Sequence, residues 1–248
     1  MEKMNIPQYA LQLAGHALPF RTRYADTCDY FRAYGKVLSM EQQACQEIAG
    51  SPVPVHIPDI DWREYLQSGM EDCPHTEYSM LTPHFSDALL PFDRVILHAV
   101  AIRWEDMAWL LCGESGVGKS TQARFLQELR PGEFTIICGD RPILSFHDNE
   151  ILVHPSPWNG KENWHGADAA PLSGIILLKR GEENRLACLS EKEAALQLYP
   201  HFIHTAWKAE NIHMVAELET RMLDLAPVWQ LTSHDVPAST RLLLESVF

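Results

Sequence analysis

The stretch Gly113-Glu114-Ser115-Gly116-Val117-Gly118-Lys119-Ser120 decides the fold, because it matches the phosphate-binding pattern G-x-x-x-x-G-K-[ST] in full. In this pattern the glycines let the backbone curl, so that consecutive N–H groups converge on a phosphate. The partial positive charge at the N-terminus of the following helix adds to the attraction. The sequence therefore predicts a nucleotide phosphate site here, with Mg²⁺ bound by the Ser120 hydroxyl and the β and γ phosphates reached by Lys119.

Eight consecutive residues are predicted to bind the nucleotide: Glu114, Ser115, Gly116, Val117, Gly118, Lys119, Ser120 and Thr121. The alternative is a glycine-rich turn with an incidental lysine. The context argues against that alternative, because an apolar strand pattern precedes the loop and a helical pattern follows it.

The segments around the loop alternate between strand and helix patterns. Upstream, residues 94–102 predict one buried strand, 104–107 a turn and 108–112 a second strand. Downstream, a helix through residue 129 is stopped by Arg130-Pro131-Gly132. Further strands are predicted at residues 134–138, 143–146, 151–154, 174–179 and 228–231, and helical patterns at 191–225, with a break at Pro200, and at 236–247. This alternation predicts an α/β sheet with helices on its faces.

Residues 1–90 differ in composition and predict a small accessory module, which leaves residues 91–248 as a nucleotide-binding domain. Closely spaced prolines between Ser51 and Pro58 predict an extended or edge-like segment. Short helices are predicted at residues 39–48 and 61–67.

The 248 residues carry a formal net charge of −13, which disfavours a nucleic-acid partner because such binding needs basic surface. No apolar run approaches the roughly 20 residues of a membrane span, so no membrane role is predicted. The first residues lead into no apolar run of the kind that a signal peptide has. The six cysteines include no CxxC pair. A cytoplasmic protein with reduced cysteines is therefore the default prediction.

Asp140 and His98 are candidate reactive residues. Asp140 follows the strand after the loop helix, and ligands of open α/β sheets gather beyond the carboxyl ends of strands. A carboxylate there could ligate Mg²⁺ or accept a proton, and the alternative is a turn-forming aspartate. His98 stands alone in an apolar strand pattern, where a histidine is either a satisfied core residue or a catalytic one.

Three runs around the loop together resemble a known family. They are residues 95–100, residues 110–120 and Ile136-Ile137-Cys138-Gly139-Asp140. They look like the kinase domain of HPr kinase/phosphorylase and, more closely, the HPr-kinase-like P-loop proteins, some of which sit beside peptide-maturation genes. The segment Ser156-Pro157-Trp158-Asn159-Gly160-Lys161-Glu162 and Ala170-Pro171-Leu172 are similar to that second group. The resemblance covers roughly residues 90–185.

The resemblance implies a P-loop kinase domain whose nucleotide fold is shared with ATP-dependent phosphoenolpyruvate carboxykinase. It implies transfer of the ATP γ-phosphoryl group to a serine hydroxyl. Lys119, Ser120 and Thr121 match the family's nucleotide loop, and His98 matches a histidine near the transferring phosphate. Asp140 matches one member of an Asp-Asp pair that supplies the base and a metal contact. The other member is Gly139 in this sequence, which leaves one carboxylate for two tasks.

Several polar and aromatic residues keep two interpretations. Lys161 and Glu162 are candidates for contact with phosphate, metal or acceptor, or else form a solvated loop pair. Trp158 either packs or stacks on a base, with packing favoured. His201, His204 and His213 are interpreted as solvated or buried helix histidines rather than metal ligands, since no HExxH pattern is present.

The sequence thus predicts an ATP- and Mg²⁺-dependent kinase that phosphorylates a hydroxyl, with a serine of a peptide or protein as the predicted acceptor. One alternative is a kinase of a small hydroxylated metabolite. The other is a partner protein that binds nucleotide without transferring phosphate, and the missing second aspartate motivates it. The acceptor, the choice between ATP and GTP, and the oligomeric state stay open. Oligomers occur in the family, but no sequence feature identifies an interface.

Overall fold

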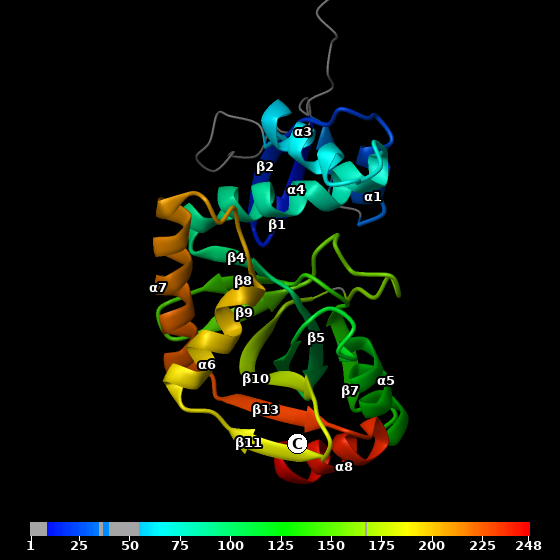
Figure 1. The fold of residues 1–248 in the computed structure, drawn as a ribbon, viewed down its shortest axis with the longest axis vertical. Coiled ribbons are helices and arrows are strands. Elements are labelled where there is room, and N and C mark those ends of the chain that lie inside the picture. Colours follow the sequence, from blue (N-terminus) through cyan, green and yellow to red (C-terminus); the bar gives the residue numbers. More distant parts are fainter. Residues whose placement is uncertain (1–8, 35–36, 40–54, 167) are drawn as a thin grey trace, which may run out of the picture.

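The computed structural model describes residues 9–34, 37–39, 55–166 and 168–248 of this mixed α/β protein (Figure 1). Near the N-terminus, an antiparallel sheet has the order β2-β1-β3. Its strands are β1 (Tyr9–Leu13), β2 (His16–Phe20) and β3 (Val37–Ser39). Four helical segments accompany this sheet: α1 (Thr27–Arg32), α3 (Asp59–Gln67), α4 (Pro74–Leu89) and the 3₁₀ turn η1 (Leu90–Phe92).

One of the two short helices predicted for this part of the chain is confirmed, and most of the other lies outside the described residues. The helix expected at 61–67 is present as α3. Ser39 ends a strand, and the rest of the helix expected at 39–48 lies outside the described residues, as do residues 51–54 of the proline-rich segment. Val55 forms a parallel bridge with Phe20, as an extended segment would. The sequence did not predict the small sheet or α4.

A ten-stranded sheet forms the larger part of the described structure. Eight strands follow the order β12-β4-β8-β9-β10-β6-β5-β7, and β13 pairs with both β10 and β11. Parallel pairing is found where β10 meets β6 and β13, and the remaining pairs are antiparallel. The strands are β4 (Arg94–Leu97), β5 (Ala99–Trp104), β6 (Met107–Cys112), β7 (Phe134–Cys138), β8 (Ile143–Phe146), β9 (Ile151–His154), β10 (Ala170–Arg180), β11 (Arg185–Cys188), β12 (Phe202–Ile203) and β13 (Val228–Ser233).

The single strand predicted at 94–102 was wrong, because the chain breaks at His98. β4 pairs with β8 and β12, whereas β5 pairs with β6 and β7. At the break, the His98 N–H donates to the His201 carbonyl at 2.8 Å and the Ala99 N–H donates to the Asp140 carbonyl at 2.8 Å. The apolar run therefore serves two separate parts of the sheet, and His98 lies at the junction.

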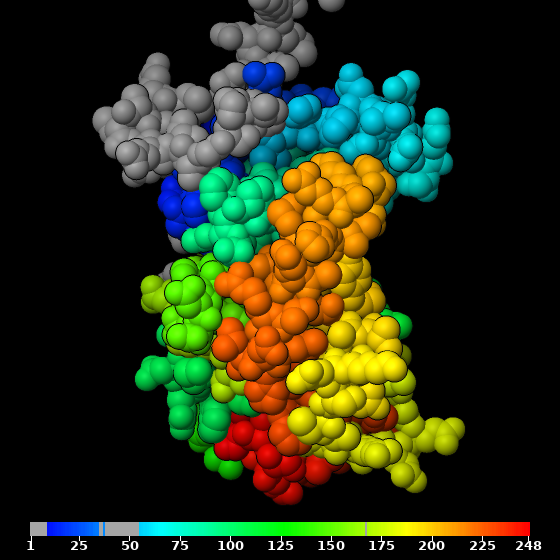
Figure 2. Space-filling model, turned by 90° about the vertical axis from the view of Figure 1, so that its left-hand side faces the viewer, coloured from blue at the N-terminus to red at the C-terminus, as the bar shows by residue number. Residues whose placement is uncertain are grey.

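Helices cover the large sheet: α5 (Lys119–Leu129), α6 (Glu191–Leu198), α7 (Ala209–Leu225) and α8 (Val236–Ser246). Figure 2 shows α7 in orange running along one side of the molecule with α6 in yellow beside it. The break predicted at Pro200 within the helical pattern at 191–225 is confirmed, but it is longer than the prediction, because helix resumes only at Ala209. Within the break, η2 (Tyr199–His201) and β12 separate α6 from α7, because β12 pairs with β4.

The N-terminal elements and the large sheet share an apolar cluster. Phe31, Leu81 and Phe85 from the first ninety residues pack in the same cluster as Ile96 and Ile143. Trp158 also belongs to it, with its indole Nε1 donating to the Tyr78 carbonyl at 2.9 Å. Its side chain is buried, which confirms packing rather than stacking on a ligand. The predicted division near residue 90 stays a prediction, but apolar packing crosses it.

Among the described residues, none of the helices combines the length and the apolar character that crossing a membrane requires.

Candidate phosphate-binding site

The loop between β6 and α5 has the backbone that a phosphate cradle needs. Three glycines of the loop have positive φ values, which residues other than glycine rarely adopt. They are Gly113 at +146°, Gly116 at +77° and Gly118 at +114°. A Cβ at Gly113 would also lie 2.8 Å from the Leu178 carbonyl oxygen. Gly118 precedes the first helical residue, Lys119, and none of the described side chains caps this end of α5. The first N–H groups of the helix therefore have no side-chain acceptor within the described part of the chain.

Lys119 is held against its own loop. Its ammonium donates to the carbonyl oxygens of Gly113 at 2.9 Å and Glu114 at 3.2 Å. Burial lowers the pKa of Lys119, and the nearby Asp140 carboxylate opposes this shift. Asp140 therefore lies near enough to Lys119 for its charge to act on the ammonium, and its part in binding phosphate or metal stays a prediction. The lysine cation is thus preorganised where phosphate oxygens would lie in a loop of this type.

The far side of the loop is fixed by β10. The Arg180 guanidinium donates to the Gly116 carbonyl at 2.7 Å. β10 also pairs in parallel with β6, the strand that leads into the loop. The same strand therefore holds the start of the loop, through β6, and its middle, through Arg180 and Gly116. Ser120 is half-buried at the start of α5, and Thr121 is exposed in the same turn.

His98 and Asp140 are brought together at the edge of the sheet. The His98 Nε2 lies 3.4 Å from Asp140 Oδ1. Both side chains are partly exposed, at 30% and 27%, so a reactant can reach either. Of the two interpretations of His98, burial among apolar residues is excluded by this exposure and by its carboxylate neighbour. A proton on Nε2 would be shared with Asp140 and would leave Nδ1 as an acceptor.

Arg141 ties this carboxylate to the N-terminal helix α4. Its Nε lies 3.2 Å from Asp140 Oδ2, and its Nη1 donates to Thr82 Oγ1 at 2.6 Å. Pro83 in the same helix lacks an N–H and so leaves the Ser79 carbonyl without its helical donor. That carbonyl accepts from Thr82 Oγ1 at 2.7 Å and from Arg141 at 3.5 Å.

The loop at residues 156–166 explains the glycine beside Asp140. The Gly139 N–H donates to the Trp164 carbonyl at 2.8 Å, and the Arg141 N–H donates to the Trp158 carbonyl at 3.0 Å. A Cβ at Gly139 would lie 2.3 Å from the Asn159 carbonyl oxygen. Any side chain at position 139 would therefore collide with backbone, so a second carboxylate does not fit there.

The tip of this loop lies near Asp140. A Cβ at Gly160 would stand 3.1 Å from the Asp140 Cβ. The next two residues, Lys161 and Glu162, are exposed and make no hydrogen bond or ion pair with another described residue. The structure brings their segment to the site, and their role stays a prediction.

His201 is a site residue that the sequence prediction missed. It lies in η2 rather than in an α-helix, and its ring centroid is 6.3 Å from that of His98. Burial lowers its pKa to about 4, and His98 and Lys119 contribute to the shift. His201 therefore presents a neutral imidazole at pH 7. The sequence offers only a proline before this histidine as a sign that the helix has ended.

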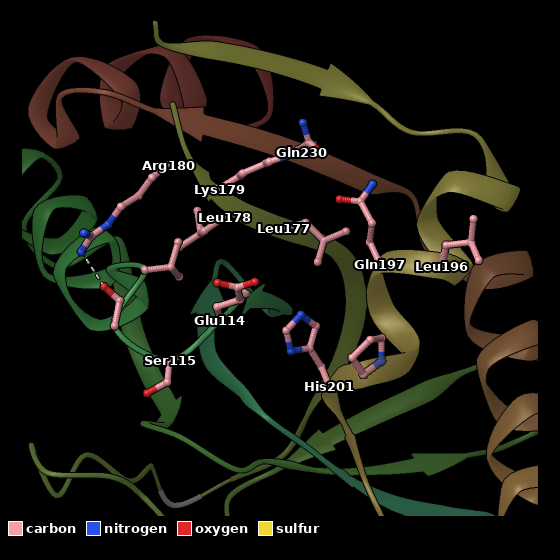
Figure 3. A pocket seen from close by; sticks show the side chains of 14 residues that line it. Glu114, Ser115, Leu177, Leu178, Lys179, Arg180, Leu196, Gln197, His201 and Gln230 are labelled. Carbon is pink, nitrogen blue, oxygen red and sulfur yellow. Dashed lines mark hydrogen bonds between the residues drawn. The ribbon is translucent and has the colours of Figure 1, made fainter. Parts of the chain in front are cut away.

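A cavity of about 600 Å³ adjoins the loop (Figure 3). Residues 113–117 of the loop form one wall, and the end of β10 with Gln230 of β13 forms another. Leu196, Gln197 and His201 close it from the side of α6 and η2. In Figure 3 the Glu114 carboxylate and the His201 imidazole point into the same space.

Comparisons with known proteins give one kind of match. No protein family model matches this sequence, and no curated protein matches it. The structure is similar to that of the HPr(Ser) kinase/phosphatase from Coxiella burnetii, with 14% sequence identity and a TM-score of 0.34. The match covers 60% of this chain and 93% of that chain.

Proposed function

We propose that this protein is an ATP- and Mg²⁺-dependent kinase that transfers the γ-phosphoryl group to a hydroxyl, with a serine of a peptide or protein as the acceptor. The observation that carries the proposal is the meeting of the glycine loop and Lys119 with the His98–Asp140 pair at one edge of the sheet. A phosphate cradle and a proton acceptor are the two parts that phosphoryl transfer to a hydroxyl requires.

The residues divide the work as follows. The N–H groups of residues 114–119 and the Lys119 ammonium would bind the phosphates. Mg²⁺ prefers oxygen ligands, and the Ser120 hydroxyl and Asp140 carboxylate offer them here. When bound, Mg²⁺ neutralises charge on the phosphate oxygens. The acceptor oxygen attacks the γ-phosphorus, the bond to the bridging oxygen breaks, and ADP leaves with its electron pair. The hydroxyl proton passes to Asp140 or to His98.

The contact between His98 and Asp140 supports a mechanism in which either side chain can accept the proton of the hydroxyl. Because Asp140 would also contact the metal, an imidazole that it orients is a second group able to take the hydroxyl proton. Most of the acceleration would come from positioning and charge stabilisation, as is general for phosphoryl transfer.

One observation favours a second candidate function, a nucleotide-binding partner protein without transfer activity. The path of the 156–166 loop excludes a side chain at Gly139, so Asp140 has no second aspartate beside it in the chain to share the tasks of base and metal ligand. Tight nucleotide binding without turnover toward any acceptor would favour this candidate over the kinase.

The first test measures the thermal midpoint with and without Mg·ATP for the wild type, Lys119→Ala and the exposed-lysine control Lys192→Ala. A ligand at about 100 times its Kd stabilises by roughly 2.7 kcal/mol, which is a shift of a few degrees for a chain of this size. We expect that shift in the wild type and the control, and its loss in Lys119→Ala. No shift of the folded wild type at millimolar Mg·ATP would contradict the proposal.

The second test identifies the acceptor. Phosphate transfer from labelled ATP is measured with serine-containing peptides and, separately, with small hydroxylated compounds. Stimulation of ATP turnover by a peptide supports the proposed acceptor class, whereas stimulation by small compounds alone would assign the protein to metabolite kinases.

A further inference from the structure

We infer that the cavity between the glycine loop and α6 is the nucleoside subsite, and that the Gln197 amide recognises the edge of a purine base. This inference rests on the proposed nucleotide binding and extends it to the base, for which the loop motif carries no information.

The position of the cavity supports a nucleoside. The sugar is covalently joined to the α-phosphate, so a triphosphate held by the loop leaves its nucleoside in a space close to the loop. The cavity meets this condition, since Gly113 to Val117 form one of its walls. Its volume of about 600 Å³ is also in the range of ligand pockets.

The sheet order separates this space from the reactive pair. β10 lies on one side of β6 and contributes the cavity wall, whereas β5 and β7 lie on the other side and lead to His98 and Asp140. A nucleotide lying across the end of β6 would thus place its base on the β10 side. Its terminal phosphate would face the side from which an acceptor reaches Asp140. His201 stands between the two spaces, because it lines the cavity and bonds to His98 through its backbone.

Apolar side chains offer surface for the flat face of a base. Leu177 and Leu178 line the cavity at the end of β10 and are nearly buried, at 4% and 8% exposed. Leu196 of α6 also lines it and is 73% exposed, which is unusual for a leucine beside a cavity. A bound base would shield part of this apolar surface from water.

Polar side chains provide the specificity. Gln197 and Gln230 both line the cavity, and neither side-chain amide hydrogen-bonds to another group within the described part of the chain. In Figure 3 the Gln197 side chain extends from α6 toward the strand that carries Gln230. An amide presents one donor face and one acceptor face. It pairs with adenine in one orientation and, rotated by half a turn, with guanine. Cytosine and uracil present the same paired donor and acceptor at their N3 edge, so the amide alone does not distinguish them from purines. The larger two-ring face of a purine covers more of the apolar surface of Leu177, Leu178 and Leu196. We therefore expect both purines to bind and pyrimidines to bind less well.

Charges around the cavity suit the remainder of the nucleotide. Lys179 and Arg180 lie on the wall nearest the loop, where they add positive potential for the phosphates. The Glu114 carboxylate points into the cavity (Figure 3) and is an acceptor for a ribose hydroxyl, as acidic side chains are in dinucleotide sites.

The experiment measures dissociation constants by calorimetry for Mg·ATP, Mg·GTP, Mg·CTP and inorganic tripolyphosphate. The proteins are the wild type, Gln197→Leu, Leu196→Asn, Lys119→Ala and the matched surface control Gln67→Leu, which changes an exposed glutamine at the end of α3. Leu196 is so exposed that its replacement is not expected to affect folding, which provides a second variant if Gln197→Leu is unstable.

For the wild type we expect ATP and GTP to bind within about threefold of each other, and CTP about tenfold more weakly. Gln197→Leu should weaken both purine nucleotides by about tenfold, the loss of one good bidentate contact. Leu196→Asn should weaken them less, and neither variant should alter tripolyphosphate binding. Gln67→Leu should match the wild type throughout.

The outcomes separate the inference from the proposed function. If tripolyphosphate binds and Lys119→Ala abolishes that binding, the phosphate site stands. If Gln197→Leu and Leu196→Asn then bind ATP like the wild type, or CTP binds as tightly as ATP, the nucleoside subsite is wrong. If neither tripolyphosphate nor any nucleotide binds the wild type, the proposed function and this inference fail together.

Discussion

His98 Nε2 lies 3.4 Å from Asp140 Oδ1, and the backbone of the same two segments is joined where the Ala99 N–H donates to the Asp140 carbonyl. The pair is therefore held by the main chain as well as by its side chains. This arrangement means that changing one side chain should leave the position of the other largely unaltered, so the two roles can be tested separately.

Asp140→Asn should abolish phosphate transfer while nucleotide binding persists. The amide keeps the size of the carboxylate but loses the charge that is proposed to bind metal and that lies beside His98. We expect transfer to fall by at least about a hundredfold, the usual contribution of a positioned acid or base. Transfer to an acceptor and the Mg·ATP-dependent thermal shift are measured together. Unchanged transfer would exclude Asp140 as a base or metal ligand.

Thr82→Val should slow transfer although Thr82 is remote from the loop. The variant keeps the side-chain shape and removes the hydroxyl that accepts from Arg141, the cation beside Asp140. We expect kcat to fall several-fold with little change in KM for ATP. Thr220→Val, an exposed threonine on α7, is the control. Equal kcat values for the two variants would mean that Arg141 does not depend on α4 for its position.

Gly139→Ala should destabilise the protein more than Gly69→Ala. At Gly69 a Cβ would meet no neighbour, so only the positive φ of 88° opposes the change, at a cost of about 1 kcal/mol. At Gly139 the new Cβ would overlap the Asn159 carbonyl, and overpacking adds about 1–3 kcal/mol or more. Denaturant midpoints compare the two. A smaller loss at Gly139 would show that the 156–166 loop moves aside easily.

Glu219→Gln should stabilise the protein at neutral pH and above. Burial raises the pKa of Glu219 to about 7, and its Oε1 has no hydrogen-bond partner among the described residues. The folded state thus keeps a proton that the unfolded chain releases near its ordinary pKa of 4.5. Stability from this group is present below pH 4.5 and is lost as the pH rises through 7. A loss of about 3.4 kcal/mol is the most that this shift allows.

The measurement for Glu219→Gln is the free energy of unfolding between pH 4.5 and 8.5. The control is Glu217→Gln, which changes an exposed carboxylate on the same helix. The stabilisation by Glu219→Gln should grow with pH and level off above 7. A pH-independent difference would mean that Glu219 does not titrate in this range.

Local patterns were enough to predict the elements nearest the loop. β7 has the predicted bounds, and α5 and β6 extend the predicted segments by a few residues at most. These elements follow from apolar periodicity and from a loop motif whose glycines fix the backbone. Asp140 was found beside the loop for the same reason, since the end of a strand defines its position.

Features that depend on pairing between distant segments were missed. The break at His98 leaves no mark in an apolar run, because it exists only where β4 and β5 choose different partners. His201 reaches the site because the two-residue strand β12 pairs with β4. The helix α4 was not predicted, and it contains Pro83, whose missing N–H frees a carbonyl that Thr82 and Arg141 bond instead.

The apolar cluster that joins α4, Ile96, Ile143 and Trp158 has a consequence for how the chain unfolds. A fragment starting near residue 91 would lose the partners of these buried side chains and the helix that holds Arg141. Cooperative unfolding in a single transition is therefore the expected behaviour, with the described elements before residue 90 as part of the same folding unit as the large sheet.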